Sequence, residues 1–435
     1  MEERALIEYF DHIEPYRALW KATNAYYYAY LESLLGFLVP KGKKVLKLEV
    51  GDSRFWKRRE QISDEECEYI IAIDVLGYIK DVGGFMEGAK RILKPNGRII
   101  ITQYNALWEP VLRVASALGL RMPSIEQNWL SMHDLKNFAH LAGLEVVKSG
   151  AKMLFPEYIP ILSSFLNKFV ANIFPFSRLG LFHYIVLRKQ AEGGNNSSLS
   201  IIVPARNEMG TIEKIVQELP ELGAFTEIIF VEGNSTDHTY NEIMRVAEKY
   251  KEKKKIKCIK QKGIGKGDAV RLGFEMAEGE ILAIYDADMT VPAEEIKNFY
   301  QAITENKADF INGSRLVYPL KKDSMRLLNI FANKFFGFAF SAILGQRLKD
   351  TLCGTKMLWK KDYEMIKENR SFFGDFDPFG DFDLLFGAAK LNLKIIDLPI
   401  HYQERTYGTT NISRFRHGWL LLKMTLFAAR KIKFI

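Results

Sequence analysis

Short apolar runs alternate with amphipathic stretches along the first half of the chain. The runs expected to form strands are 43–48, 67–75, 98–102, 144–148 and 183–188, and helical patterns cover 85–93 and 131–142. A turn at Pro95-Asn-Gly97 leads into the strand at 98–102. Strands that alternate with helices are typical of a parallel sheet with helical crossovers. We therefore predict an α/β fold for this half.

The second half shows the same alternation, and polar residues follow its strands directly. The expected strands are 199–204, 227–232, 280–285 and 311–315, with helical segments at 268–277 and 327–344. In open parallel sheets, ligands bind beyond the carboxyl ends of the strands. The polar loops at these strand ends are therefore the expected place of a binding site.

A polar segment with paired glycines, Gln190–Ser198, separates the two halves. Such a cluster between two apolar runs indicates a loop. The chain has 435 residues, which is too many for one ordinary core. We predict a first domain at 1–190, a linker at 191–198, a second domain at 199–413 and a basic amphipathic helix at 414–435.

Composition and charge narrow the setting. The hydrophobic content is 48% and the charged content is 26%, as in a folded globular protein. The net charge of +8 favours phosphates or anionic lipids, and since no nucleic-acid motif is present we expect no nucleic-acid partner. Three cysteines far apart predict a reducing compartment. No signal-peptide pattern and no apolar stretch of about 18 residues occurs, so we expect a cytoplasmic chain without a spanning helix.

Two strand-end loops have the chemistry of a nucleotide site. The strand at 199–204 leads into Pro204, Arg206 and Glu208, which we expect beside a bound nucleotide. Glu232 ends the next strand and can accept hydrogen bonds from a base or ribose. Asp237 follows it, and we favour a role for Asp237 in capping the next helix over a role in binding.

A glycine-rich loop and a pair of carboxylates follow. Gly263–Gly267 precedes a helix, where such loops cradle phosphate, and Lys266 adds positive charge. The strand at 280–285 ends in Asp286 and Asp288. Two carboxylates one residue apart can converge on Mg²⁺ or Mn²⁺, which binds through one or two carboxylates and substrate phosphates. We predict Asp286 and Asp288 as metal ligands.

Together these motifs resemble glycosyltransferase family 2, with the GT-A fold, and within it the polyprenyl- (dolichyl-) phosphate sugar synthases. The resemblance covers about 199–427. It implies an inverting transfer from a UDP- or GDP-sugar to a polyprenyl phosphate or a cell-surface glycan. It also implies that the nucleotide-sugar is bound by Pro204, Arg206, Glu208, Glu232, Lys266 and Asp286. Two positions depart from the family pattern: Glu232-Gly-Asn-Ser235 replaces a paired-aspartate motif, and Thr410-Asn411 replaces a Ser-Lys pair.

The acceptor stays open between a phosphate and a hydroxyl. The resemblance implies that Arg315, Arg326 and Arg405 lie near the acceptor or the diphosphate. A phosphate acceptor is already an anion and needs such cations, whereas a hydroxyl must lose a proton to a carboxylate base. For that base we predict Asp381 first and Asp383 second.

The first half resembles a class I S-adenosylmethionine methyltransferase over 68–76 and 91–101. The family's glycine-rich loop is reduced to Gly51. The interval between Ser53 and Cys67 is far too short for even one strand–helix–strand unit, which needs roughly 30 residues. We therefore predict a truncated, degenerate methyltransferase fold that does not bind the cofactor. The alternatives are a bifunctional enzyme that also methylates and a non-catalytic nucleotide-sugar-binding scaffold.

The last segment bears on membrane contact. Residues 414–435 combine apolar bulk with basic ends, which is typical of a helix lying in a membrane interface. The alternative is a helix packed on the catalytic domain. Because a lipid-linked acceptor requires membrane contact, we expect peripheral attachment on the inner face of the membrane.

Overall fold

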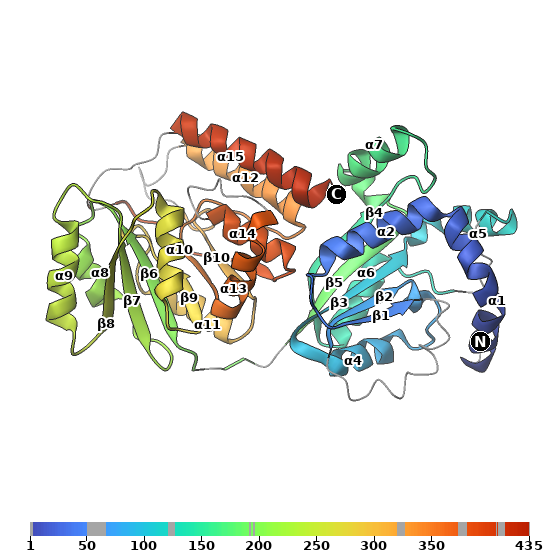
Figure 1. Cartoon of the computed structure of the whole chain (residues 1–435), viewed down its shortest axis with the longest axis horizontal. Coiled ribbons are helices and arrows are strands. Elements are labelled where there is room, and N and C mark those ends of the chain that lie inside the picture. Colours follow the sequence, from blue (N-terminus) through green and yellow to red (C-terminus); the bar gives the residue numbers. More distant parts are fainter. Residues whose placement is uncertain are drawn as a thin grey trace. The chain divides into compact units, whose positions relative to one another are not determined.

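The computed structural model divides the chain into two compact units (Figure 1). Unit 1 comprises Met1–Ala191 with Lys433–Ile435, and unit 2 comprises Glu192–Ile432. The structure describes residues 3–49, 67–120, 127–190, 193–194, 196–319, 327–372, 381–405, 407 and 414–434. Each unit has its own sheet and its own buried core.

Unit 1 is built on a five-stranded sheet in the order β1-β2-β3-β5-β4. Its strands are β1 (Val45–Glu49), β2 (Cys67–Ile73), β3 (Leu93–Tyr104), β4 (Leu144–Lys152) and β5 (Phe182–Lys189). The first three are parallel, and β5 runs antiparallel to both β3 and β4. Because β1 pairs directly with β2, the described sheet has no strand between them, as the short interval from Ser53 to Cys67 requires.

The start of β3 differs from the prediction. The segment Pro95–Gly97, expected as a turn, lies inside β3, where Cys67 pairs with Leu93 but Tyr69 pairs with Arg98. This register shift is a bulge, a place where a sheet accommodates proline and glycine. A Cβ at Gly97 would stand 2.9 Å from the Glu68 carbonyl oxygen, so only glycine fits this close approach.

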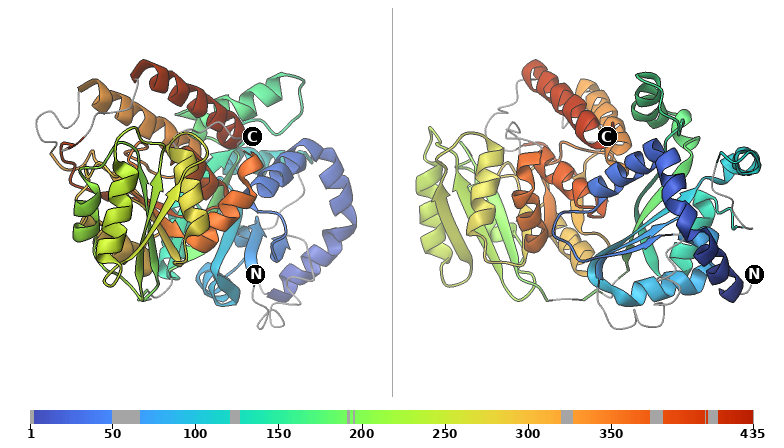
Figure 2. Two further views of the ribbon diagram at one scale, coloured as in Figure 1. Left: turned by 60° about the vertical axis from the view of Figure 1, so that its left-hand side comes forward. Right: turned by 45° about the vertical axis from the view of Figure 1, so that its right-hand side comes forward.

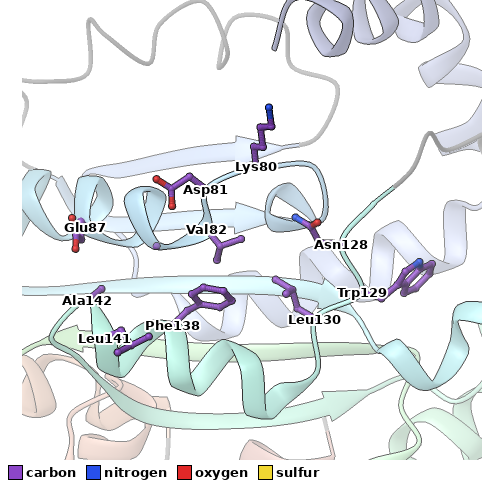
Figure 3. Close-up of a pocket in the computed structure, with 11 residues that line it drawn as sticks. Lys80, Asp81, Val82, Glu87, Asn128, Trp129, Leu130, Phe138, Leu141 and Ala142 are labelled. Carbon is purple, nitrogen blue, oxygen red and sulfur yellow. The ribbon is translucent and has the colours of Figure 1, made fainter. Parts of the chain in front are cut away.

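Helices cover both faces of the unit 1 sheet (Figure 2). They are α1 (Glu3–Thr23), α2 (Ala25–Leu38), α4 (Val82–Ile92), α5 (Glu109–Ala117), α6 (Met132–Leu141) and α7 (Leu162–Lys168). The buried side chains of α2 pack on one face and those of α4 and α6 on the other. A cavity of about 500 Å³ lies between α4 and α6, lined among others by Val82, Trp129 and Phe138 (Figure 3).

Unit 2 is built on a seven-stranded mixed sheet in the order β12-β10-β11-β9-β6-β7-β8. Its strands are β6 (Leu199–Ala205), β7 (Thr226–Glu232), β8 (Lys255–Lys260), β9 (Ile281–Ile284), β10 (Phe310–Ser314), β11 (Lys356–Trp359) and β12 (Ile395–Pro399). Strands β9, β6, β7 and β8 are parallel, while β11 runs antiparallel to β9 and β10. The carboxyl ends of β6, β7 and β9 therefore meet at one edge.

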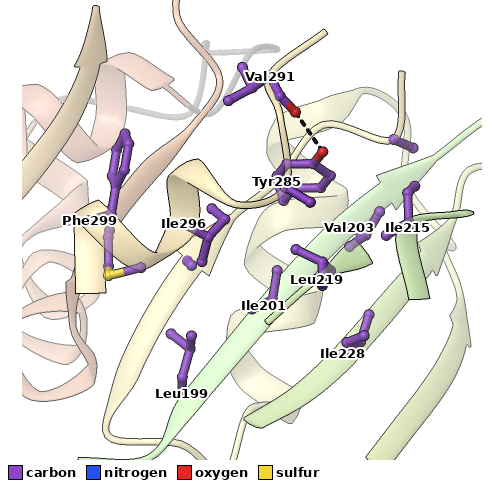
Figure 4. Packing of buried hydrophobic residues seen from close by; sticks show 14 of the residues in the cluster. Leu199, Ile201, Val203, Ile215, Leu219, Ile228, Tyr285, Val291, Ile296 and Phe299 are labelled. Atoms are coloured by element: carbon purple, nitrogen blue, oxygen red, sulfur yellow. Dashed lines mark hydrogen bonds between the residues drawn. The ribbon is translucent and has the colours of Figure 1, made fainter. Parts of the chain in front are cut away.

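The helices of unit 2 surround this sheet (Figure 1). They are α8 (Ile212–Glu218), α9 (Thr239–Tyr250), α10 (Lys266–Met276), α11 (Glu295–Thr304), α12 (Leu327–Leu344), α13 (Lys360–Glu368), α14 (Asp381–Lys390) and α15 (Arg414–Ala428), which continues as a π-helical turn to Lys433. Residues such as Leu199, Ile201 and Phe299 form the core (Figure 4). Helices α12 and α15 pack together. The predicted α/β class is confirmed in both units.

Among the residues that the structure describes, no helix is both long enough and apolar enough to cross a bilayer.

Candidate active site

The carboxylates Asp286 and Asp288 lie in a turn that the core holds in place. Just after β9, the buried Tyr285 donates a hydrogen bond from its hydroxyl to the Val291 carbonyl oxygen, 2.6 Å away (Figure 4). This bond closes the segment that carries both carboxylates. Asp288 Oδ1 accepts hydrogen bonds from the backbone nitrogen and the hydroxyl of Thr290, at 3.1 and 2.9 Å. The turn is therefore fixed from both sides.

Asp286 meets the glycine-rich loop. Lys266, the first residue of α10, places Nζ 2.5 Å from Asp286 Oδ1. It can do so because Gly265, with φ 92°, turns the chain into the helix in a conformation that favours glycine. Burial raises the pKa of Asp286, but Lys266, together with Lys356 and Arg315, outweighs it, so the pKa lies below its usual range. Asp286 is therefore an anion at neutral pH.

A glycine from the loop before β11 closes over this ion pair. A Cβ on Gly354 would stand 2.1 Å from Asp286 Oδ2 and 2.2 Å from Lys266 Nζ. Contacts this short would displace the Asp286 carboxylate and the Lys266 ammonium, so a side chain at position 354 would disturb this ion pair. The constraint is steric, and it links this loop to the carboxylate turn.

Asp288 is held by an arginine from the loop that follows β12. Arg405 Nη2 lies 3.0 Å from Asp288 Oδ2, and its Nη1 lies 2.8 Å from Glu208 Oε1. The backbone nitrogen of Gln403 donates to the Thr290 carbonyl oxygen at 2.8 Å, which ties the arginine's loop to the carboxylate turn. The ends of β6, β9 and β12 thus meet at one guanidinium.

Glu208 is the most unusual carboxyl group of the site. Its Oε2 is buried and accepts no hydrogen bond from the residues that the structure describes. Burial raises the pKa of Glu208 to about 7, an effect that Arg405 opposes and Asp288 reinforces. A buried polar atom without a partner is costly, so Oε2 points to a hydrogen-bond donor supplied by a ligand.

The loops after β6 and β7 hold each other. The backbone nitrogen of Asn207, a residue with φ 58°, donates to Ser235 Oγ at 3.0 Å. The buried Glu232 accepts from the Ser235 backbone nitrogen at 2.6 Å. Asp237 Oδ1 accepts from the Thr239 backbone nitrogen at 2.9 Å. The N-cap of α9 is His238 and not Asp237, so the capping role favoured from the sequence is not the one observed.

Pro204 and Arg206 flank the end of the central strand. Pro204 is the penultimate residue of β6, and the exposed Arg206 follows that strand. The structure thus brings Glu208, Lys266, Asp286, Asp288 and Arg405 together at the carboxyl ends of the strands.

The remaining predicted residues make other contacts or lie outside the described part. Arg315 binds the fully buried Asp350 through Nε and Nη2, at 2.7 and 2.9 Å, so its guanidinium serves a buried ion pair. Arg326 and the side chain of Asp381 lie outside the described residues, although Asp381 opens α14. Asp383 Oδ2 lies 3.2 Å from Arg370 Nε and 3.4 Å from Arg271 Nη1.

Sequence reasoning missed three supporting residues: Gly354, Thr290 and Tyr285. Gly354 lies just before β11, and which groups it approaches depends on the antiparallel pairing of β11 with β9. Thr290 follows Asp288 by two residues, the spacing of a local side-chain-to-backbone bond, so a sequence signal for it existed. The role of Tyr285 follows only from burial of its ring.

The donor atoms of this site suit a hard cation that keeps substrate ligands. Among the described residues, no group of three or more His, Cys, Asp or Glu side chains could hold a metal ion by itself. Asp286 and Asp288 offer carboxylate oxygens one residue apart, which fits a divalent ion that completes its shell with phosphate oxygens and water. The residues present therefore fit Mg²⁺ or Mn²⁺.

The corresponding edge of unit 1 carries aromatic rings. Asp74 follows β2 with φ 55°, and the Tyr27 hydroxyl lies 3.5 Å from its Oδ2. The Tyr27 ring stacks on that of Tyr104, the last residue of β3, with centroids 6.0 Å apart. Tyr27 comes from α2 and is buried. The ends of β2 and β3 are thus covered by a side chain of the chain itself.

Two family models match the chain. Residues 200–366 match the family described as Glycosyl transferase family 2, and residues 9–149 match the family described as Methyltransferase domain. Both resemblances predicted from the sequence are confirmed.

Individual proteins are similar to unit 2. A structure of glucosyl-3-phosphoglycerate synthase from Mycobacterium tuberculosis, in complex with Mn²⁺, UDP and glucosyl-3-phosphoglycerate, is 15% identical, with a TM-score of 0.39, and the alignment covers 54% of this chain and 80% of that one. Glycosyltransferase AglJ of Haloferax volcanii is 27% identical over 229 residues, 52% of this chain and 69% of that protein. A dolichol-phosphate mannosyltransferase of Pyrococcus furiosus is 33% identical over 249 residues, 54% of this chain and 67% of that protein. With this identity and the family match, the chain belongs to glycosyl transferase family 2.

Proposed function

We propose that unit 2 is a metal-dependent, inverting glycosyltransferase that takes its sugar from a nucleotide-diphospho-sugar. The observation that carries this proposal is the convergence of separate segments on two carboxylates. Lys266 reaches Asp286 from the start of α10, and Arg405 reaches Asp288 from the loop after β12. Asp286 and Asp288 are the proposed ligands of Mg²⁺ or Mn²⁺.

The chemistry of transfer follows from where these charges lie. When bound, the metal ion neutralises the diphosphate as its bond to the sugar breaks. Lys266 stands at a helix start behind a glycine-rich loop, an arrangement that favours anions, and would hold a phosphate oxygen of the donor. Arg405 would bind the diphosphate or the acceptor phosphate, because its planar guanidinium suits bidentate contacts with oxyanions.

The nucleoside part is proposed to lie along the loops after β6 and β7. Pro204 and Arg206 flank the end of the central strand, and Glu232 is buried at the end of its neighbour. One oxygen of Glu232 accepts from the Ser235 backbone nitrogen. The other oxygen would accept a hydrogen bond from a ribose hydroxyl or a base.

A lipid phosphate is the acceptor class that we favour. The Pyrococcus furiosus relative is a dolichol-phosphate mannosyltransferase. In unit 2 itself, α12 exposes Phe331, Phe335 and Phe338 at helical spacing, and α15, which packs on α12, exposes Trp419. An exposed apolar face of this kind suits contact with lipid chains. We propose that it attaches unit 2 peripherally to the inner face of a membrane.

A hydroxyl of a cell-surface glycan is the second candidate, and it needs a base. Asp381 opens α14 and is the better placed by sequence. Asp383 lies between Arg271 and Arg370, where a structural ion pair explains it. Arg315 likewise forms an ion pair with Asp350. We therefore propose that Arg315 stabilises the structure of the site and does not contact the acceptor.

A donor screen tests the function. The full chain is incubated with UDP-, GDP- and TDP-sugars, with and without Mn²⁺, and hydrolysis of the donor is measured, followed by transfer to a short polyprenyl phosphate. We expect hydrolysis of at least one donor that requires metal and is lost on chelation. Metal-independent hydrolysis, or none of any donor, would contradict the proposal.

For unit 1 we propose that the methyltransferase fold no longer binds S-adenosylmethionine. Tyr27 stacks on Tyr104 and approaches Asp74. These contacts lie at the strand ends where a ligand of this fold class binds. The described residues at this edge therefore do not fit a nucleoside cofactor.

A further inference from the structure

The segment between β4 and β5 of unit 1, residues 154–180, differs from the rest of that unit. It contains α7 and two short 3-10 turns at Val170–Asn172 and Phe176–Arg178. We call it the arm. Its helix α7 stands clear of the five-stranded sheet in every view of Figures 1 and 2. A projecting element of this kind would be expected to show polar side chains to water.

The arm has the opposite polarity. Ser163 and Asn167, two polar residues of α7, are fully buried and hold the arm's own backbone. Asn167 accepts from the backbone nitrogens of Leu154 and Phe155 at 2.8 and 2.9 Å. Ser163 donates to the Glu157 carbonyl oxygen at 2.6 Å. The inward face of α7 is thus a hydrogen-bonded polar seam.

The outward face of the arm is apolar. Ile161 is 86% exposed and Phe174 is 70% exposed. The other exposed apolar side chains of the arm are Tyr158, Ile159, Leu162, Phe165, Phe169, Ile173, Phe176 and Leu179. Singly exposed apolar residues are normal on proteins, but ten of them in one segment of 27 residues indicate an interaction surface. The arm thus directs polar groups inward and apolar groups outward.

The tip of the arm is also strained. Ile161 has φ 67° and ψ −52°, and the Leu162 backbone nitrogen donates to the Pro160 carbonyl oxygen at 2.8 Å. This is a γ-turn of the rare positive-φ kind. A β-branched residue is a poor choice for this conformation. Strain of this kind gathers at functional sites, and here it presents an isoleucine to solvent.

The apolar surface continues onto a neighbouring element. Trp108 Nε1 donates to the Leu179 carbonyl oxygen at 2.7 Å, and Asn105 Nδ2 donates to the Gly180 carbonyl oxygen at 2.8 Å, which fixes the end of the arm beside the start of α5. Helix α5 and the turn before it add more exposed apolar side chains, namely Leu107, Val111 and Val114.

The arm carries a small excess of positive charge, which favours an anionic partner. Its charged side chains are Lys168 and Arg178, which are basic, and Glu157, which is acidic. The Arg178 guanidinium lies 5.1 Å from the centroid of the exposed Phe174 ring. Aromatic rings mixed with basic side chains, on a projecting helix, are typical of segments that lie in the interface of an anionic bilayer.

We propose that the arm inserts its apolar side chains into the headgroup boundary of an anionic phospholipid bilayer. Unit 1 would then serve as a membrane-docking module that has exchanged cofactor binding for lipid contact. The proposal rests on contacts within unit 1 and holds whichever donor or acceptor unit 2 uses.

Vesicle flotation of the full chain tests it, with phosphatidylcholine vesicles that contain or lack phosphatidylglycerol. The double variant Ile161→Asp/Phe165→Asp should lose about 10- to 100-fold of its partitioning to the anionic vesicles, because two large apolar side chains leave the interface. The matched control is Leu141→Asp on α6, which is 79% exposed in the same unit but lies outside the arm. The control should bind within about twofold of the parent.

Two further measurements keep the test decisive. Donor hydrolysis in the same preparations should be unchanged, so that a failure of the arm is separable from a failure of the proposed chemistry. An environment-sensitive fluorophore on Ile161→Cys should shift to the blue with anionic vesicles, which requires no loss-of-function variant. Equal flotation of parent and double variant, or no spectral shift, would overturn the proposal. If the parent is a dimer, the double variant is a monomer and both bind vesicles equally, the surface instead binds a second copy of the chain.

Discussion

The two units bring parallel strands to a common edge but fill that edge with different chemistry. In unit 2 the turn after β9 carries Asp286 and Asp288, each balanced by a cation from a distant segment. In unit 1 the ends of β2 and β3 meet a tyrosine from α2, and Tyr27 covers Asp74. Parallel strands that end at one edge of a sheet therefore do not make a site by themselves. What matters is whether the side chains beyond the strands remain free to meet a ligand.

The strongest test of this contrast exchanges an acidic side chain at each edge. Asp288→Ala removes a proposed metal ligand and the partner of Arg405, and it should lower turnover by about 10³-fold or more. Asp74→Asn in unit 1 keeps a hydrogen-bond acceptor for Tyr27, so turnover should change by less than about twofold. Steady-state donor hydrolysis measures both. Near-parent activity of the first variant would break the comparison.

The second test concerns stability. Arg315→Ala leaves Asp350 buried without its cation, and we expect the free energy of unfolding to fall by about 3–5 kcal/mol. In unit 1, Arg188→Ala leaves Glu145, whose side chain is 22% exposed. Water can replace that lost contact, so the fall should be smaller. Urea unfolding followed by circular dichroism gives both values. If the Arg315 variant is as stable as the parent but has lost activity, Arg315 contacts the substrate after all.

The third test adds one methyl group to each unit. In Gly354→Ala a Cβ would stand 2.1 Å from Asp286 Oδ2 and displace the ion pair, which should reduce turnover by about 10- to 100-fold. Gly77→Ala in unit 1 brings a Cβ to 3.1 Å from Gln103 Nε2, the end of a flexible side chain, and should have little effect on turnover. Kinetics at saturating metal separate the two. If both variants behave alike, the tight packing around the carboxylates has no catalytic meaning.

The last test concerns cofactor binding by unit 1, for which we expect no signal. Isothermal titration of the full chain with S-adenosylmethionine should give no heat of binding, because Tyr27 lies at the strand ends of unit 1. A Tyr27→Ala variant should also show none if the interval from Ser53 to Cys67 lacks the ribose-binding strand. Micromolar binding by the parent would restore the bifunctional alternative.

The sequence predicted those features that are local. Asp286 and Asp288 follow directly from an apolar strand that ends in two carboxylates, and Lys266 follows from a glycine-rich loop before a helix. The pairing of Arg405 with both Glu208 and Asp288, by contrast, joins residues far apart in the chain. Such contacts depend on the order of the strands in the sheet. That order cannot be predicted from the hydrophobic pattern of a single sequence.

Arg315 and Pro95–Gly97 show a second reason why the sequence alone was not sufficient. An arginine at a strand end near a site reads equally as a ligand or as the partner of a buried acid, and only the position of Asp350 decides. A proline and a glycine before an apolar run read as a turn, whereas pairing with β2 makes them a bulge. In both cases the deciding neighbour lies on another segment of the sheet.

The hydrogen bond from Tyr285 to Val291 makes the carboxylate turn part of the unit 2 core. Opening the turn requires moving a ring packed among the residues that hold the sheet together, so the turn and the sheet should open in one cooperative step. The Met289 amide, which donates to the Asp286 carbonyl oxygen, should then exchange with deuterium as slowly as the amides of β6 and β9. The proposed metal ligands would share the lifetime of the core, and the enzyme would keep its catalytic geometry until the sheet opens.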